Sequence, residues 1–89
     1  MSKEFFFELS AFEDFQNWAI LDREIYRKII IILKNIEHSS FNIPEQAIRL
    51  KRELNNYWSI KINEEHRLVY KITSKKIIII TCKYSYDRI

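Results

Sequence analysis

The sequence has no glycine, one proline, one cysteine and no long apolar run. Without glycine, every tight turn has to be made by Asn, Asp or Ser, or by ordinary type I geometry. The single cysteine, Cys82, cannot form an internal disulfide, and no Cys and His spacing resembles a metal motif. The apolar runs IIIIL and IIII are far shorter than the roughly 20 residues that cross a bilayer. We therefore expect a soluble protein from a reduced, intracellular compartment, without a metal or another cofactor.

What is present is a short chain rich in apolar side chains. Its 89 residues predict one domain. A chain of this length buries only about 60–65% of the surface that its unfolded form exposes. Hydrophobic residues make up 47% of the sequence and aromatic residues 15%, which is enough for one core. The first ten residues, MSKEFFFELS, carry acids on both sides of three phenylalanines, which is unlike a signal peptide.

The charges are sorted along the chain. Residues 1–48 hold five basic and eight acidic side chains, a net charge of −3. Residues 49–89 hold ten basic and four acidic side chains, a net charge of +6. This asymmetry favours a polyanionic partner for the second half. Lysines that are solvated and protect strand edges would give the same pattern.

A strand and a helix are expected first. KEFFFEL, residues 3–9, is short and aromatic-rich, which is typical of a strand. Ser10, with Glu13 three residues later, is a capping-box pattern and predicts a helix over about residues 11–20. The apolar side chains on one face of that helix would be Phe12, Phe15 and Ala19.

Asp22 is expected to cap a second helix over about residues 23–37. The IIII run inside it fits a helix or a strand, but apolar residues continue at helical spacing on both sides, which favours a helix. The predicted buried stripe is Ile25, Ile29, Ile32, Leu33 and Ile36. The segment HSSFNIP then breaks the pattern, and Pro44 is expected to begin a short turn of helix through Leu50.

Three strands are expected in the second half. YWSIKI, HRLVYKI and KIIIITCKY are joined by the short segments NEE and TSK, which suit antiparallel hairpins. The predicted fold is α+β, in the order strand, helix, helix, strand, strand, strand, with both helices packed on one face of a small, mainly antiparallel sheet. A central place in that sheet for residues 3–9 would explain why FFF is apolar on both faces.

The segment LNNYWSIKINEEHRLVYKI, followed by a final strand and CKYSY, strongly resembles the YoeB/Txe family of bacterial type II toxin–antitoxin systems, within the RelE/ParE superfamily. The likeness runs from about residue 50 to residue 86, and WSxxIxxEHRLVY is a long motif without gaps. The strand-helix-helix start fits the same RelE-like fold in order and length. A ParE-like gyrase poison shares that fold, but the EHRLVY motif argues against it.

The resemblance implies an mRNA interferase, a small ribonuclease that enters the ribosomal A site and is held inactive by an antitoxin. The reaction needs no metal, because a neighbouring 2′-hydroxyl attacks the scissile phosphate. The implied partner is an antitoxin of the YefM/Phd kind, whose disordered acidic segment folds over the basic cleft. Operator DNA would be bound only through the antitoxin complex. A cytoplasmic location and a homodimer also fit the resemblance.

The family's site residues carry over only in part. The phosphate-binding arginine falls on Arg67, and the C-terminal tyrosine falls on Tyr86. The basic residues that line the cleft fall on Lys51 and Lys61. The general-base glutamate falls on Ile48, and the histidine that acts as general acid falls on Ser85. Isoleucine cannot accept a proton, and a serine hydroxyl is a poor acid near neutral pH.

Three alternatives stay open at this point. A shift of the loop would bring Glu45 or Glu53 to the base position. The RelE branch cuts RNA without the glutamate and histidine, and a comparable cluster here would be Lys51, Lys61, Arg67, Lys83 and Tyr86. Alternatively, the chain has lost catalysis and persists as an antitoxin-binding module and corepressor of its operon.

Other residues are expected to serve the structure. The resemblance implies that His66 is structural, and Glu64 and Glu65 suit a solvated hairpin turn. Asn56 stands where the family commonly has glycine, and asparagine tolerates a positive φ. Trp58 is expected in the core rather than as a base-stacking platform, and Cys82 as a small buried residue.

Overall fold

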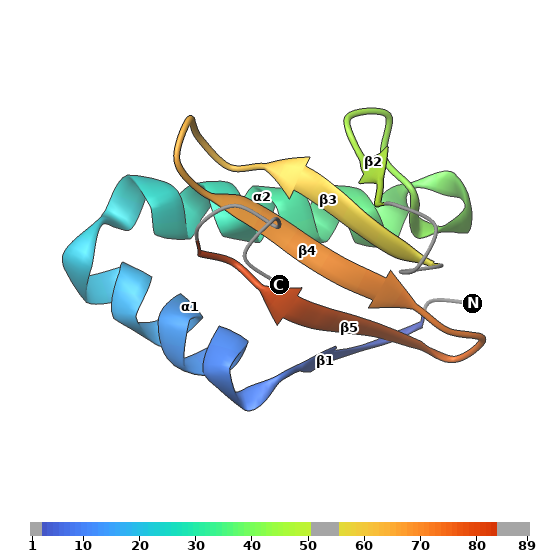
Figure 1. The fold of residues 1–89 in the computed structure, drawn as a ribbon, viewed down its shortest axis with the longest axis horizontal. Coiled ribbons are helices and arrows are strands. Elements are labelled where there is room, and N and C mark those ends of the chain that lie inside the picture. The colour runs from blue at the N-terminus through green and yellow to red at the C-terminus, as the bar shows by residue number, and fades with distance from the viewer. Residues whose placement is uncertain (1–2, 51–55, 84–89) are drawn as a thin grey trace.

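The computed structural model describes residues 3–50 and 56–83 of the chain. Over those ranges, two helices and a 3₁₀ turn precede most of a five-stranded sheet (Figure 1). The elements, in chain order, are β1 (Glu4–Phe7), α1 (Leu9–Leu21), α2 (Arg23–His38), the 3₁₀ turn (Ser40–Asn42), β2 (Ile48–Arg49), β3 (Tyr57–Lys61), β4 (Arg67–Ile72) and β5 (Lys76–Thr81). The α+β fold and the two antiparallel hairpins β3–β4 and β4–β5 confirm the predicted class.

The sheet has the order β1-β5-β4-β3-β2. β1 pairs with β5 in parallel, and every other pair is antiparallel. The expectation that β1 is central is therefore wrong, because β1 forms one edge. Phe5 and Phe7 pack against the core, while Phe6 points to the other face and is 42% exposed. The run FFF is thus apolar on both faces, and only Phe5 and Phe7 pack against the core.

The opposite edge also differs from the sequence-based expectation. Residues 48 and 49 form the short strand β2 rather than helix, so the turn of helix expected from Pro44 to Leu50 is wrong. Ile48 pairs with Ser59, and Arg49 pairs with Trp58. Strand pairing across the sheet decides this segment, and two residues are too few for a periodic signal.

The capping box predicted at the start of α1 is also wrong. The helix begins at Leu9, so Ser10 lies inside the first turn, and the N-cap residue Glu8 makes no side-chain capping bond. The Glu8 N–H instead donates to the Ile79 carbonyl at 2.9 Å, which ties the start of α1 to the sheet. The expected helix face is wrong in part: Ala11 and Trp18 are the buried residues of α1, and Phe12 is 43% exposed.

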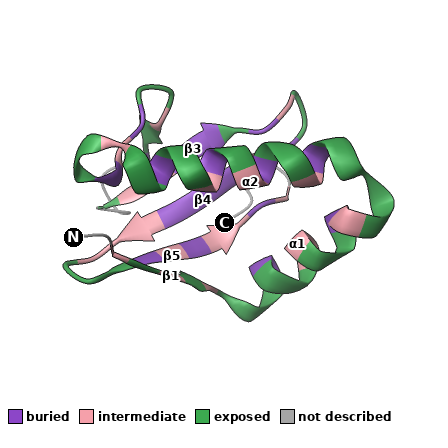
Figure 2. Cartoon of the chain, turned by 180° about the vertical axis from the view of Figure 1, so that it is seen from behind, coloured by how far each residue is buried: buried purple, intermediate pink, exposed green. Residues whose placement is uncertain are grey.

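The second helix agrees with its prediction. The Asp22 carboxylate caps α2 by accepting from the Glu24 and Ile25 N–H groups at 3.1 and 3.4 Å. Ile25, Ile29, Ile32 and Ile36 are buried, and Leu33 packs against them. Seen from behind the sheet, α2 lies across the strands with its outer side exposed (Figure 2).

The core lies between the helices and one face of the sheet. At one end of it, the Trp18 indole donates to the Cys82 carbonyl at 3.1 Å. Cys82 is fully buried, as expected, and its thiol contacts the Ala11 carbonyl at 3.6 Å. Burial raises the pKa of this thiol to about 12. The buried Tyr70 hydroxyl donates to the Asn42 carbonyl at 2.8 Å, which fixes the loop after α2 onto β4.

Asparagine and threonine make the turns that glycine would otherwise make. Asn56 has a φ of 69°, which confirms the prediction for this position, and Phe41 and Asn42 are also in the left-handed region. In the β3–β4 hairpin, the Asn63 side chain accepts from the Glu65 and His66 N–H groups. In the β4–β5 hairpin, the Thr73 hydroxyl accepts from the Lys76 N–H at 2.9 Å.

Candidate functional site

The face of the sheet away from the helices, called the open face below, carries the described site residues. In Figure 1 this face is toward the viewer and α2 lies behind the strands. Side chains alternate between the two faces of a strand. Ile60, Leu68 and Tyr70 point to the core, so their neighbours along β3 and β4 point to the open face. These neighbours pair as Tyr57 with Lys71, Ser59 with Val69 and Lys61 with Arg67.

Lys61 and Arg67 lie directly opposite each other at the hairpin end of β3 and β4. Cβ atoms of such a pair are about 4.5–5.5 Å apart, and like charges at that separation repel each other. The Glu64 carboxylate relieves this repulsion, because its Oε2 lies 2.7 Å from the Lys61 ammonium. Lys61, and to a smaller extent Arg67, hold the pKa of Glu64 below its ordinary value. Lys61 thus already holds one anionic group beside Arg67.

The ion pair between Lys61 and Glu64 is exposed to water. The Lys61 side chain is 51% exposed and the Glu64 side chain 94%. Exposed ion pairs contribute little to stability, so a phosphate can replace the carboxylate at little cost. Glu64 is solvated, as the sequence indicated, but its pairing with Lys61 was not foreseen. The sequence signal for this pair was the spacing of three residues between Lys61 and Glu64 in a tight hairpin.

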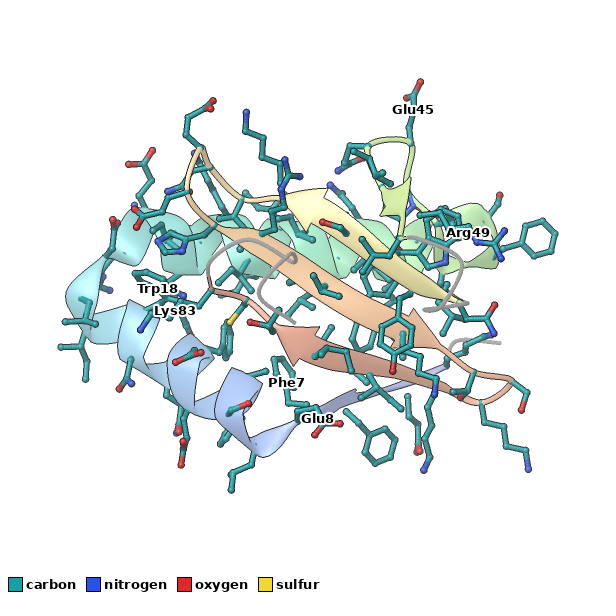
Figure 3. The ribbon with its side chains drawn as sticks, viewed as in Figure 1. Phe7, Glu8, Trp18, Glu45, Arg49 and Lys83 are labelled. Atoms are coloured by element: carbon teal, nitrogen blue, oxygen red, sulfur yellow. The ribbon has the colours of Figure 1, made fainter. Side chains whose placement is uncertain are left out.

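Lys83 lies at the same end of the sheet as Lys61 and Arg67. β5 ends at Thr81, which pairs with Val69 two residues from Arg67, and Lys83 lies two residues beyond the end of that strand. The Lys83 N–H donates to the Thr81 hydroxyl at 3.3 Å, and this hydroxyl donates to the Lys83 carbonyl at 3.1 Å. Figure 3 shows Lys83 at the end of the sheet toward the corner between α1 and α2.

The structure therefore places two of the predicted site residues, Lys61 and Arg67, directly opposite each other, and Lys83 lies just beyond the end of β5. The other members of the predicted site, Lys51, Ser85 and Tyr86, lie outside the described residues, as does Glu53.

Ile48, the residue expected at the general-base position, is on the open face. It pairs with Ser59, which places it diagonally across β2 and β3 from Lys61. Diagonal neighbours of this kind are roughly 7–8 Å apart. Ile48 is 58% exposed. Glu45 lies in the loop before β2, and its carboxylate points away from the sheet (Figure 3). In this conformation Glu45 does not replace the missing base.

Ser59 is a feature that sequence reasoning missed. It is 1% exposed, and its hydroxyl has no hydrogen-bond partner among the described residues. An unpaired buried hydroxyl costs about 1–3 kcal/mol. Ser59 lies between Ile48 and Val69 on the open face, two residues from Lys61. The alternation of Tyr57, Ser59 and Lys61 along β3 was enough to place it there.

His66 supports the hairpin from inside the protein. Its side chain is 6% exposed and meets the Trp18 ring edge-on, with 4.8 Å between ring centroids. Its carbonyl accepts from the Ile62 and Asn63 N–H groups at 3.0 and 3.2 Å. This packing supports the structural role that the resemblance implied.

Within residues 3–50 and 56–83, no group of three or more His, Cys, Asp or Glu side chains is placed to hold a metal ion. Neither described helix has the length and apolar character that a membrane crossing requires. A shallow apolar hollow on the helix side of the sheet brings no catalytic cluster together; it is lined by Phe5, Phe7, Ile30, Leu33, Lys34 and Glu37.

Comparison with known proteins gives a consistent result. Residues 7–86 match the family described as "YoeB-like toxin of bacterial type II toxin-antitoxin system". The toxin YoeB of Escherichia coli O6:H1 is 36% identical over 76 residues, which are 85% of this chain and 90% of that toxin. Two structures from Staphylococcus aureus, a YoeB–YefM complex and a YoeB dimer, superpose with TM-scores of 0.80 and 0.81 at 33% and 34% identity. Each likeness covers 97% of this chain and all of the other.

Proposed function

The chain belongs to the YoeB-like toxin family of bacterial type II toxin–antitoxin systems, and on that premise we propose that it is a metal-independent endoribonuclease that cuts mRNA in the ribosomal A site. The observation that carries the proposal is the facing pair of Lys61 and Arg67 on the open face, with Lys83 at the same end of the sheet. Such a cluster suits a phosphate between two nucleotides. Lys51, Tyr86 and Ser85 complete the proposed site.

The proposed reaction uses the RNA's own 2′-hydroxyl as the nucleophile. Its oxygen forms a bond to the scissile phosphorus while the bond from phosphorus to the 5′-oxygen breaks, which leaves a 2′,3′-cyclic phosphate and a free 5′-hydroxyl. The 2′-hydroxyl proton passes to a neutral lysine amine of the cluster, and a neighbouring ammonium protonates the leaving 5′-oxygen. Arg67 and Lys61 hold the non-bridging oxygens and stabilise the charge that develops on them.

The cluster replaces the acid and base that this chain lacks. Ile48 offers no proton acceptor, and Ser85 offers a weak acid, so positive charge and positioning have to supply most of the rate enhancement. Tyr86 is proposed to stack on a base or to orient the 2′-hydroxyl. The exposed Glu64 competes with the substrate for Lys61, because both are anionic.

The proposed partner is an antitoxin of the YefM/Phd kind. The complex from S. aureus joins YoeB with YefM, and that structure resembles this chain over nearly its whole length. An acidic antitoxin segment lying over the open face would neutralise Lys61 and Arg67 and block RNA. The YoeB dimer from the same organism supports a homodimer as well. We place the protein in the cytoplasm, where messages are translated, and operator DNA is proposed to be bound only through the antitoxin complex.

The test is an in vitro translation reaction with the purified protein, in which primer extension maps cuts in the message. We expect cuts that appear only when ribosomes are present and that persist in EDTA-treated toxin returned to the reaction. An established YoeB toxin serves as the positive control. Message that stays intact at toxin levels that cleave in this control overturns the proposal.

A second function, antitoxin binding without catalysis, is favoured by one observation. Ile48 occupies the open face diagonally across from Lys61, and Glu45 turns away from it. Growth arrest on induced expression, relieved by the neighbouring antitoxin, supports the ribonuclease. Tight antitoxin binding without growth arrest supports the binding module.

A further inference from the structure

A row of four residues crosses the open face at the end of the sheet away from Lys61 and Arg67. Tyr57 on β3 pairs with Lys71 on β4, Lys71 pairs with Ile78 on β5, and Ile78 pairs with Phe6 on β1. Directly paired residues share a face of the sheet. We call this set, Tyr57, Lys71, Ile78 and Phe6, the aromatic row.

Each ring in the aromatic row has an ammonium group near it. The Lys71 ammonium lies 5.5 Å from the centre of the Tyr57 ring, and the Lys76 ammonium lies 4.8 Å from the centre of the Phe6 ring. Lys76 is two residues before Ile78 on β5, so it also lies on the open face. Neither lysine forms an ion pair with a described carboxylate, although Glu4 lies opposite Lys76 in the register. Both cations are therefore available to a ligand.

The dimensions of the aromatic row suit a ligand in the form of an extended polymer chain. Neighbouring strands are about 4.8 Å apart, so three spacings separate Tyr57 from Phe6 by roughly 14 Å. Four residues along β4 separate Lys71 from Arg67 by a similar distance of roughly 13 Å. Phe6 is 42% exposed on an edge strand, where an aromatic ring gains little for stability.

In the aromatic row Phe6 is exposed and Tyr57, Lys71 and Ile78 are half-buried, and rings and cations side by side at a protein surface favour single-stranded RNA. Unpaired bases stack on aromatic side chains, and the phosphates between them bind lysine. Double-stranded RNA would not suit the row, because its bases are stacked inside the duplex. A cation over an exposed ring is held weakly, so a base can take its place while the ammonium moves to a phosphate.

We infer that the aromatic row is a second contact for single-stranded RNA, which holds nucleotides flanking the scissile phosphate through stacking on Tyr57 and Phe6 and ion pairing with Lys71 and Lys76. The inference rests on the proposed RNA-directed function. It adds a binding surface outside the cluster of Lys61, Arg67 and Lys83. It also gives Tyr57 a role in RNA binding that the sequence did not indicate.

The experiment measures RNA binding by fluorescence anisotropy with labelled oligoribonucleotides of about 3 and about 10 nucleotides. Every ribose carries a 2′-O-methyl group, so the RNA cannot be cut. We expect the long oligonucleotide to bind more tightly than the short one. Tyr57→Leu and Phe6→Leu should each weaken binding of the long one about fivefold or more and leave the short one unchanged. Leucine keeps the apolar contact and removes the stacking surface, and urea denaturation checks that each variant is folded.

Salt dependence provides a readout that a merely structural residue would not change. Lys71→Gln should lower the slope of log affinity against log salt by about 0.7 for the long oligonucleotide. Lys75→Gln is the matched control, because Lys75 is an exposed lysine in the β4–β5 hairpin outside the row. The slope of log affinity against log salt should differ between the long and the short oligonucleotide by the same amount in Lys75→Gln as in the wild type.

Three results would overturn the inference. They are equal affinity of the wild type for both lengths, leucine variants that bind the long oligonucleotide as tightly as the wild type, and variants that lose binding of poly-L-glutamate but not of RNA. The last result would assign the surface to an acidic peptide. Failure of the proposed function is distinguishable, because a wild-type protein that binds RNA through the row but leaves messages intact in translation contradicts cleavage alone.

Discussion

The two faces of the sheet differ in the charge of their side chains and in how their buried polar groups are paired. On the helix side, Leu68, Tyr70 and Ile79 are fully buried, and the Tyr70 hydroxyl has a partner. On the open face, two cations stand opposite each other and the buried Ser59 hydroxyl has no partner among the described residues. Natural sequences tend to depart from local consistency where they function. The difference agrees with the proposal that the open face binds a ligand, while the helix side stabilises the fold.

The largest expected effect separates the two faces by stability. Ile79→Ala should lower the free energy of unfolding by about 2–5 kcal/mol, because Ile79 is fully buried against the helices. Ile48→Ala, a matched isoleucine on the open face that is 58% exposed, should change it by less than about 0.5 kcal/mol. Urea denaturation of both variants measures the difference. Equal losses would mean that the two faces contribute alike to stability.

Removing one charge should separate activity from stability. Arg67→Gln should reduce message cleavage about 100-fold or more, because the phosphate loses a preorganised cation. Its free energy of unfolding should stay within about 0.5 kcal/mol of the wild type. Arg49→Gln is the matched control, since Arg49 pairs with Trp58 and its place in the β2 alternation is off the open face. Wild-type cleavage by Arg67→Gln in the translation assay would exclude this arginine from the site.

Alkaline pH should lower the free energy of unfolding through two buried groups on the helix side of the sheet. Burial raises the pKa of the Cys82 thiol from an ordinary value of 9.0 to about 12, and it also raises the pKa of Tyr70. From about pH 9 to pH 12 the unfolded chain therefore binds fewer protons than the folded one. The free energy of unfolding should fall over that window, by up to about 1.4 kcal/mol per pH unit for each group.

Cys82→Ala is the control for the alkaline effect. It removes the thiol, so its stability should fall less steeply between about pH 9 and pH 12 than that of the wild type. Urea denaturation at several pH values gives both curves. Parallel curves would show that the thiol does not take part.

The smallest expected effect concerns the carboxylate that occupies the cluster. Glu64→Gln should tighten binding of a non-cleavable RNA about twofold to fivefold, because Lys61 no longer has an anionic partner. Stability should barely change, since the pair is exposed. Glu65→Gln is the matched neighbour in the same turn. Tighter RNA binding by Glu65→Gln alone would contradict the role given to Glu64.

Much of the fold was readable from local patterns. The stripe of isoleucines in α2, the Asp22 cap and the hairpins β3–β4 and β4–β5 follow from periodicity and short connections. The edge position of β1 and the existence of β2 did not, because both depend on pairing with strands far away in the sequence. The start of α1 was misplaced because a backbone bond from Glu8 to the sheet outweighs the Ser10 signal.

The candidate site was readable to a similar extent. Alternation along the strands puts Lys61 and Arg67 on one face, and the hairpin makes them opposite neighbours. The place of Ile48 beside them could not be predicted without knowing that residue 48 belongs to a strand. The partnerless Ser59 hydroxyl and the contact between Lys61 and Glu64 depend on side-chain packing, which spacing alone does not determine.

The pairing of β1 with β5 also constrains when this protein can fold during its own synthesis. Glu4 meets Lys76, so the first strand waits for a partner made 72 residues later. Contacts this distant along the chain carry a large loop-closure entropy and form late. The nascent chain can form α1 and α2 early, but the complete sheet has to wait until β5 leaves the ribosome. The five-stranded sheet can therefore be completed only after residue 81 has emerged from the ribosome.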